Sequence, residues 1–145
     1  MHPYPHHYQV SVSAAPADSV KLAASGLPTL ESNSPPEFDG PPGYWSPETL
    51  LTAAVADCFV LSFRAVARAS KFEWKSLAVD VTGKLDRPAG AAASFTEFAT
   101  HAKLTVAPGT DAARAKALLE KAEKICLTTA SLKGANHLHA EVVEG

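Results

Sequence analysis

The longest apolar stretch of the chain, residues 50–63, is interrupted by only three polar residues. Its start carries the signals of a helix N-terminus: Ser46 suits the N-cap, Pro47 suits the first helical position, and Glu48 places a negative charge at the positive end of the helix. Because the run has no polar stripe, it differs from a surface helix and must be covered on more than one side. A membrane span needs roughly 20 apolar residues, and this run is shorter, so residues 46–70 are predicted to form a buried core helix.

Alternating apolar and polar positions predict strands on both sides of this helix. Residues 8–12 and 20–24 suggest an N-terminal hairpin. Residues 26–44 are rich in proline and glycine, which predicts a loop that leads to the helix. After the helix, two long antiparallel strands are expected, each with one buried face, formed by Leu77, Val79, Val81 and Leu85 in the first and by Phe98, Ala102, Leu104 and Val106 in the second. His101 falls on the opposite, solvated face of the second strand.

A second, amphipathic helix is predicted after the turn at residues 108–110. It ends near Cys126, and residues 137–143 can close as an edge strand. The buried positions expected in this helix follow three- and four-residue spacing: Ala113, Ala117, Leu118, Ala122 and Ile125. Strands and helices that segregate in this way indicate an α+β fold. Because so few other elements remain to cover the first helix, the most economical cover is a second copy of the chain, and we expect a homodimer.

Composition narrows the classes of protein that fit. A chain of 145 residues that is 46% hydrophobic has the size of one domain, so we expect a single domain over residues 1–145, with residues 1–6 as a flexible tail. The net charge of -2 argues against nucleic-acid and membrane partners. The N-terminus carries no apolar signal segment, so a cytoplasmic location is expected. His2, His6 and His7 fit a mobile tail better than a metal site, and no cofactor or metal is expected.

The chain has two cysteines, Cys58 in the apolar helix and Cys126 at the end of the second helix. They form no CxxC motif or other metal-ligand spacing. In a reducing compartment a permanent disulfide is disfavoured, which leaves either inert buried thiols or a redox pair.

The string WSPETLLTAAVADCFVLSF resembles the signature of the OsmC/Ohr family, the osmotically induced and organic hydroperoxide resistance proteins. Further likeness lies in the preceding PPEFDGPPGYW, which looks like the loop of an OsmC-like branch, in the second cysteine with a following Ser-Leu pair, and in the order of elements. The resemblance implies an OsmC-like fold, in which antiparallel sheets wrap around paired central helices in an intertwined homodimer. It also implies thiol-dependent reduction of organic hydroperoxides, with hydrogen peroxide as a further candidate substrate.

By the same resemblance, Cys58 is the thiolate that attacks the peroxide, and Cys126 resolves the resulting sulfenic acid as a disulfide that an external thiol reduces. Glu48 matches the family's glutamate, which orients an arginine against the reactive cysteine. Glu48 and Cys58 are ten residues apart, about 15 Å along a helix, so they must be coupled across the dimer or through an intermediary.

Two positions depart from the family pattern. No arginine precedes Arg64, and the only strongly basic side chain ahead of the helix is Lys21, a point charge without the guanidinium fork. A buried thiol without a cationic neighbour keeps a high pKa, which argues against an enzyme with fast peroxidase chemistry. Leu127 stands where relatives commonly have proline after the second cysteine, and without that proline the second helix can continue.

Two other functions remain open. The chain could keep the fold without efficient peroxidase chemistry and bind a small apolar or electrophilic ligand at the dimer interface, as the missing arginine suggests. A hydrolase that uses Cys58 with a histidine ranks third, because no histidine is tied to the thiol by a motif.

Overall fold

A computed structural model describes all 145 residues of the chain. The contacts divide it into two units, Met1–Leu50 and Leu51–Gly145, which are described separately below. Helices and strands segregate along the chain, so the predicted α+β class is confirmed. The single domain and the flexible tail stay predictions.

The first unit contains a small antiparallel sheet in the order β1-β2-β3, formed by Ser11–Ser13, Val20–Ala23 and Leu30–Ser32. The predicted hairpin is therefore present as β1 and β2. The loop expected at residues 26–44 is only partly correct, because it contains β3 and the short 3-10 helix η1, Pro36–Phe38. Residues 30–32 contain neither proline nor glycine, so their backbone N–H groups are free to pair with β2.

Helix α1, Pro47–Ala69, begins at the cap that the sequence predicts. The Ser46 hydroxyl accepts the Thr49 N–H at 3.1 Å, and the Thr49 hydroxyl in turn accepts the Ser46 N–H at 2.8 Å. This reciprocal pair satisfies two backbone donors that a helix start leaves unpaired. The predicted helix start is confirmed.

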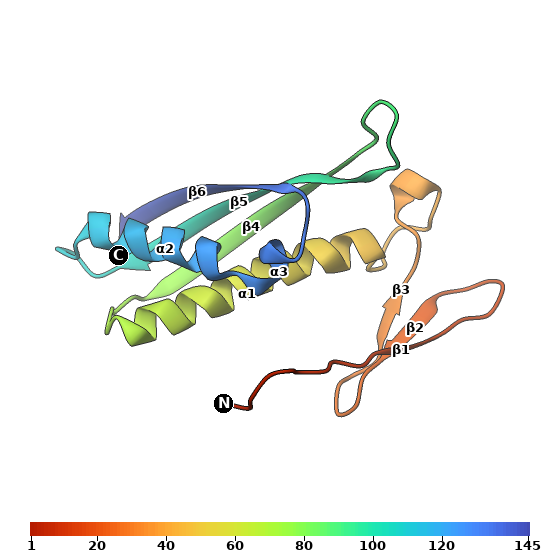
Figure 1. Ribbon diagram of the computed structural model, residues 1–145, viewed down its shortest axis with the longest axis horizontal. Helices are drawn as coiled ribbons and strands as arrows, with labels where there is room; N and C mark the ends of the chain where they lie inside the picture. Colours follow the sequence, from red (N-terminus) through yellow and green to blue (C-terminus); the bar gives the residue numbers. More distant parts are fainter. The chain divides into compact units, whose positions relative to one another are not determined.

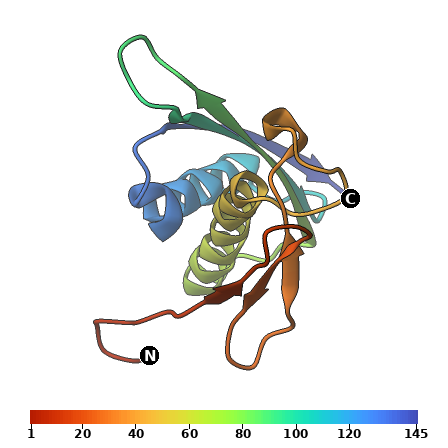
Figure 2. The same cartoon turned by 90° about the vertical axis from the view of Figure 1, so that its right-hand side faces the viewer.

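The second unit is built on a three-stranded sheet in the order β4-β5-β6, formed by Ser76–Asp86, Ser94–Val106 and Ala135–Glu144 (Figure 1). Strand β4 is antiparallel to β5, as predicted, and β6 is parallel to β5 at the sheet edge. Helix α2, Ala112–Ile125, and the single-turn helix α3, Leu127–Ala130, form the crossover from β5 to β6. The part of α1 from Leu51 onwards and α2 lie on the same face of this sheet (Figure 2).

The core of the second unit lies between that sheet face and the two helices. Phe63 of α1 is fully buried and meets the Trp74 ring edge-to-face, with ring centroids 5.3 Å apart, and full burial of one such side chain is worth about 1.5–3 kcal/mol. The buried cluster comprises Phe59, Phe63, Val66 and Ala67 of α1, Phe72 of the turn after α1, Ala102, Leu104 and Val106 of β5, and Ala115, Leu118, Leu119 and Ala122 of α2.

Most of the predicted inward positions are correct, and the exceptions have local causes. Leu85 is 38% exposed because a β-bulge between Lys84 and Leu85 shifts the register of β4 against β5. In α2, Leu118 and Ala122 are buried as expected, whereas Ala113, Ala117 and Ile125 are exposed and Ala115 and Leu119 take their places. The spacing predicted the helix correctly, but the buried face that it predicted is rotated about the helix axis from the observed one.

Within one chain, α1 is buried along one stripe only. The buried residues Val55, Phe59, Phe63 and Val66 follow helical spacing, whereas Leu61 is 51% exposed. Helix α1 has the length and the hydropathy of a membrane-spanning helix, but its buried stripe packs against α2 and β5, which makes it a core helix.

Candidate functional site

Cys58 lies near the middle of α1, between the exposed Asp57 and the buried Phe59, and is half-buried. Ser62 follows one turn later on the same helix face, and its Oγ lies 4.0 Å from Cys58 Sγ. This face of α1 turns toward the junction between α2 and α3, beside which α1 passes (Figure 1).

Cys126 forms that junction. Its backbone is extended, with φ -64° and ψ 112°, so it is both the C-cap of α2 and the N-cap of α3. Its carbonyl accepts hydrogen bonds from the Thr129 hydroxyl at 3.2 Å and from the Ala130 N–H at 3.1 Å, which closes the turn of α3. The continued second helix that Leu127 allows does not occur, because the chain leaves the helical conformation at Cys126.

The turn of α3 brings Thr128 to Cys58. Burial raises the pKa of the Cys58 thiol, but hydrogen bonds from the Thr128 hydroxyl and the Thr128 backbone N–H, helped by the Cys126 and Ser62 side chains, outweigh burial and lower that pKa below its ordinary value. Hydrogen bonds to the charged form stabilise the thiolate. Cys58 therefore sits among neutral donors, and no charged side chain is among the groups that set its pKa.

The pKa of Cys126 moves in the opposite direction. Burial raises it, hydrogen bonds from the Thr129 hydroxyl and N–H lower it in part, and the neighbouring Cys58 raises it again. Cys126 is only 2% exposed, and both cysteines are free thiols. The structure thus places an ionisable, half-buried thiol beside a buried thiol that holds its proton.

Glu48, the third predicted site residue, belongs to the first unit. It occupies the first turn of α1 and is not among the groups that set the pKa of Cys58. Within the first unit, Glu48 lines a largely apolar cavity of about 380 Å³, together with Val12, Leu22, Asn33, Phe38 and Leu50 among others. Lys21 is exposed on β2, where it stands opposite Glu31 of β3.

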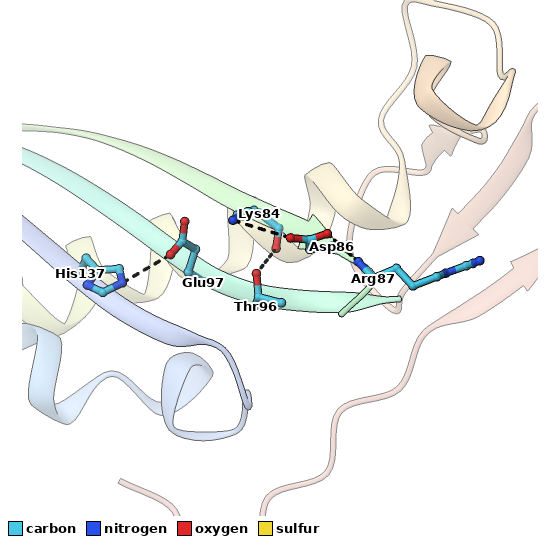
Figure 3. Close-up of polar contacts among 6 residues, drawn as sticks. All are labelled: Lys84, Asp86, Arg87, Thr96, Glu97 and His137. Atoms are coloured by element: carbon cyan, nitrogen blue, oxygen red, sulfur yellow. Dashed lines mark hydrogen bonds and ion pairs between the residues drawn. The ribbon is translucent and has the colours of Figure 1, made fainter. Parts of the chain in front are cut away.

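Another group of polar side chains lies on β4, β5 and β6 (Figure 3). Glu97 meets His137 at 3.7 Å, Lys84 meets Asp86 at 3.7 Å, and the Arg87 side chain points away from the other five residues drawn. These ion pairs are solvent-exposed, and exposed pairs contribute little. His101, exposed as predicted, lies beside His139 on the same sheet, with ring centroids 5.3 Å apart.

The sequence did not single out Ser62 or Thr128 as site residues. Ser62 could have been found, because a residue four positions after a helical cysteine shares its face. Thr128 carries no such signal, because its approach to Cys58 depends on the chain breaking at Cys126. If the second helix continued past Cys126, residue 128 would lie at a different position around the helix axis.

In a comparison with protein families, residues 40–141, more than half of the chain, match the family described as OsmC-like protein. The match includes Glu48, Cys58 and Cys126. Comparison with curated proteins gives no match.

Solved structures share the fold at low sequence identity. An OsmC-like protein of unknown function from Vibrio cholerae O1 biovar eltor superposes with a TM-score of 0.86 at 13% identity, over 94% of this chain and 99% of that chain. An organic hydroperoxide resistance protein OsmC from Legionella pneumophila gives 0.76 at 23%, over 97% and 98%. An organic hydroperoxide resistance protein from Elizabethkingia anophelis, with thiocyanate bound, gives 0.78 at 18%, over 99% and 100%.

Proposed function

The chain belongs to the OsmC-like protein family, and we propose that it is a thiol-dependent peroxidase that reduces organic hydroperoxides, with hydrogen peroxide as a further candidate substrate. One observation carries the proposal: Cys58 and Cys126 lie close enough to act on each other's pKa, which is lowered for the more accessible thiol and raised for the buried thiol. The thiolate is the nucleophilic form of cysteine. Two solved structures of the same fold are named organic hydroperoxide resistance proteins, which agrees with this substrate class.

The proposed reaction begins at Cys58. Its thiolate attacks the terminal oxygen of the hydroperoxide, the O–O bond breaks, and the alkoxide takes up a proton and leaves as the alcohol. Cys58 is oxidised by two electrons to the sulfenic acid. The Cys126 sulfur then attacks the Cys58 sulfur, an S–S bond forms, and the oxygen leaves as water with the Cys126 proton. Two equivalents of an external thiol reduce the disulfide, and both cysteines return to the free thiols that the structure shows.

The remaining roles rest on the family resemblance. Glu48 orients a basic group toward the site in a homodimer, and Lys21 is the candidate for that group in the chain. A cytoplasmic location fits the need for a reducing thiol pool. No cofactor enters the reaction, because every electron passes through sulfur.

Replacement of the reacting sulfur tests the proposal. Cys58→Ser should reduce the consumption of cumene hydroperoxide under a dithiol reductant to the uncatalysed rate, because a serine hydroxyl is not ionised at neutral pH. Cys126→Ser is the matched control: it should still consume about one equivalent of peroxide and leave a Cys58 sulfenic acid that dimedone traps. Full turnover by the Cys58→Ser variant would refute the peroxidase.

The apolar cavity beside Glu48 favours a second candidate, an OsmC-fold protein that binds a small apolar or electrophilic ligand without efficient peroxidase chemistry. That function requires no ionised Cys58. A Cys58 pKa at or above that of free cysteine, with no disulfide to Cys126 after stoichiometric peroxide, would support the binding protein. Rapid formation of the disulfide would exclude it.

A further inference from the structure

We propose that His101 and His139 form a binding site for a divalent transition-metal ion, with zinc as the type case, on the outer face of the β4-β5-β6 sheet. The two imidazoles are the protein ligands, and water completes the coordination of the ion. The site is separate from the thiols, because α1 and α2 cover the opposite face of this sheet. The inference therefore does not depend on the proposed peroxidase.

The register of the sheet places the two histidines side by side. His101 of β5 and His139 of β6 are partners in the parallel ladder. Both are exposed, whereas Thr100 and Ala102 on either side of His101 are buried. Side chains alternate between the two faces of a strand, so both imidazoles leave the sheet on the face away from the helices.

The distance between the two rings suits one shared ion. Zinc–nitrogen bonds are about 2.0–2.1 Å long and the ligands of zinc are arranged tetrahedrally, so two imidazoles on one ion hold their ring centroids roughly 5 Å apart. The centroids of His101 and His139 are 5.3 Å apart, and the ring planes are tilted by 47°. Because both side chains are exposed, rotation of the rings can aim one nitrogen of each at a common point while the backbone stays in place.

The charged side chains around this pair are engaged with one another. Lys103 lies 4.0 Å from Glu141, and His137 lies 3.7 Å from Glu97 (Figure 3). The two proposed ligands contact each other but take part in no hydrogen bond or ion pair of the structure. An ion can therefore bind both imidazoles without breaking an existing polar contact.

The coordination predicts the class of ion and the character of the site. No group of three His, Cys, Asp or Glu side chains is arranged to hold a metal ion, so a site with two protein ligands is open and exchangeable. Imidazole favours zinc, copper and nickel, whereas magnesium and calcium prefer oxygen ligands. Asp80 of β4 is the register partner of His101 on the side away from His139, and a carboxylate commonly orients a metal-bound histidine.

Zinc-dependent stabilisation of the fold tests the site. The two histidines are far apart in the sequence and meet only in the folded chain, so an ion that they share stabilises the folded state. The measurement is urea unfolding of the full chain at neutral pH, followed by circular dichroism, with Zn²⁺ alone as the probe. Zinc should raise the urea midpoint, EDTA should reverse the rise, and Mg²⁺ should produce none.

His101→Ala and His139→Ala should each remove the zinc-dependent rise. Loss of one of the two ligands should also weaken zinc binding, measured by calorimetry, by roughly tenfold or more, since even the loss of a group that supports a ligand costs that much. His137→Ala is the matched control, because His137 lies on the same strand and face but is paired with Glu97; it should keep the rise. Both cysteines and the N-terminal histidines are present in every variant, so zinc bound there contributes equally.

Without zinc, the three variants should unfold close to the midpoint of the unaltered chain, because substitutions of exposed side chains change stability little. The absence of a rise in the unaltered chain would overturn the proposal, as would a rise that persists in His101→Ala or in His139→Ala. A rise lost equally in His137→Ala would overturn the assignment of the two ligands. None of these results bears on the proposed function, because the test involves no hydroperoxide.

Discussion

The thiols of Cys58 and Cys126 are neighbours in space but differ in how readily they lose a proton. Burial raises the pKa of the half-buried Cys58, but hydrogen bonds, chiefly from Thr128, outweigh burial and lower that pKa. Cys126 is buried and sits beside the more acidic sulfur, so its pKa is raised. The order of ionisation decides which sulfur attacks first and which one holds its proton until the second step.

This order predicts the pH dependence of the first chemical step. A free cysteine has a pKa of about 8.5. Because the pKa of Cys58 is lowered, Cys58 forms its thiolate at a lower pH than a free cysteine does. The rate of a single turnover with cumene hydroperoxide, followed by stopped flow in Cys126→Ser, should rise with pH and level off with a midpoint below that value. A midpoint at or above the free-cysteine value would contradict the assignment of Cys58 as the activated thiol.

The sequence identified part of the site and missed the rest for a physical reason. Cys58 and Cys126 stood out through the family resemblance, and the structure makes them neighbours. Thr128 was not predicted, because its position depends on the extended backbone of Cys126, and a leucine at position 127 gave no sign of that break. Local sequence patterns indicate which face of a helix or strand is buried. They do not indicate where a helix ends when tertiary packing sets that end.

Among the elements of the second unit, the close approach of α1 to β4 depends on Gly83. A Cβ at this position would lie 2.9 Å from the Thr52 hydroxyl oxygen and 2.9 Å from a ring carbon of Phe95. Phe95 is stacked on Phe98 with centroids 5.2 Å apart. The short Thr52 side chain and the stacked Phe95 ring cannot both move away from an added Cβ. The distance between helix and sheet at this point therefore requires glycine.

Gly83→Ala should therefore destabilise the protein. Overpacking of a tight contact costs about 1–3 kcal/mol, and chemical denaturation should show a loss of that size in the free energy of unfolding. The double variant with Thr52→Ala should recover part of the loss, because it removes one of the three atoms that crowd the new Cβ. A loss that is unchanged by Thr52→Ala would show that the contact with α1 is not its cause.

Elements with one buried face were predictable, whereas irregularities within them were not. The alternation holds in β4 from Leu77 to Val81 and in β5 from Phe98 to Val106, because one sheet face is covered by helices. The bulge at Leu85 and the strand at residues 30–32 were missed: a bulge leaves no mark in an alternating pattern, and the flanking prolines concealed a three-residue strand.

At the scale of the whole molecule, the uncovered side of α1 supports the predicted homodimer. Asp57, Leu61, Arg64 and Arg68 are exposed and share one helix face by their spacing. The acidic residue lies on one side of Leu61 and the two basic residues on the other. Two such faces packed antiparallel around Leu61 would pair opposite charges, whereas parallel packing would oppose like charges.

Leu61→Glu should disrupt that association. In the antiparallel arrangement it replaces a central apolar contact by two like charges that face each other across the helix pair, and burying charges at such a contact costs several kcal/mol. Light scattering coupled to gel filtration should show a dimer for the unaltered chain and a monomer or a large loss of dimer for the variant. Ala117→Glu, on the exposed side of α2, is the control and should stay dimeric. A monomeric unaltered protein would refute the homodimer.

The position of Cys126 at the break between two helices has a further consequence once the proposed disulfide forms. A bond from residue 58 to residue 126 would tie the centre of α1 to the crossover between β5 and β6, and close most of the second unit into one covalent ring. In the chain-entropy treatment, closing a ring of this length lowers the conformational entropy of the unfolded chain, which stabilises the folded state by about 4 kcal/mol. The oxidised protein would then have a higher free energy of unfolding than the reduced protein. Reaction with peroxide would stabilise the fold until an external thiol reduces the disulfide.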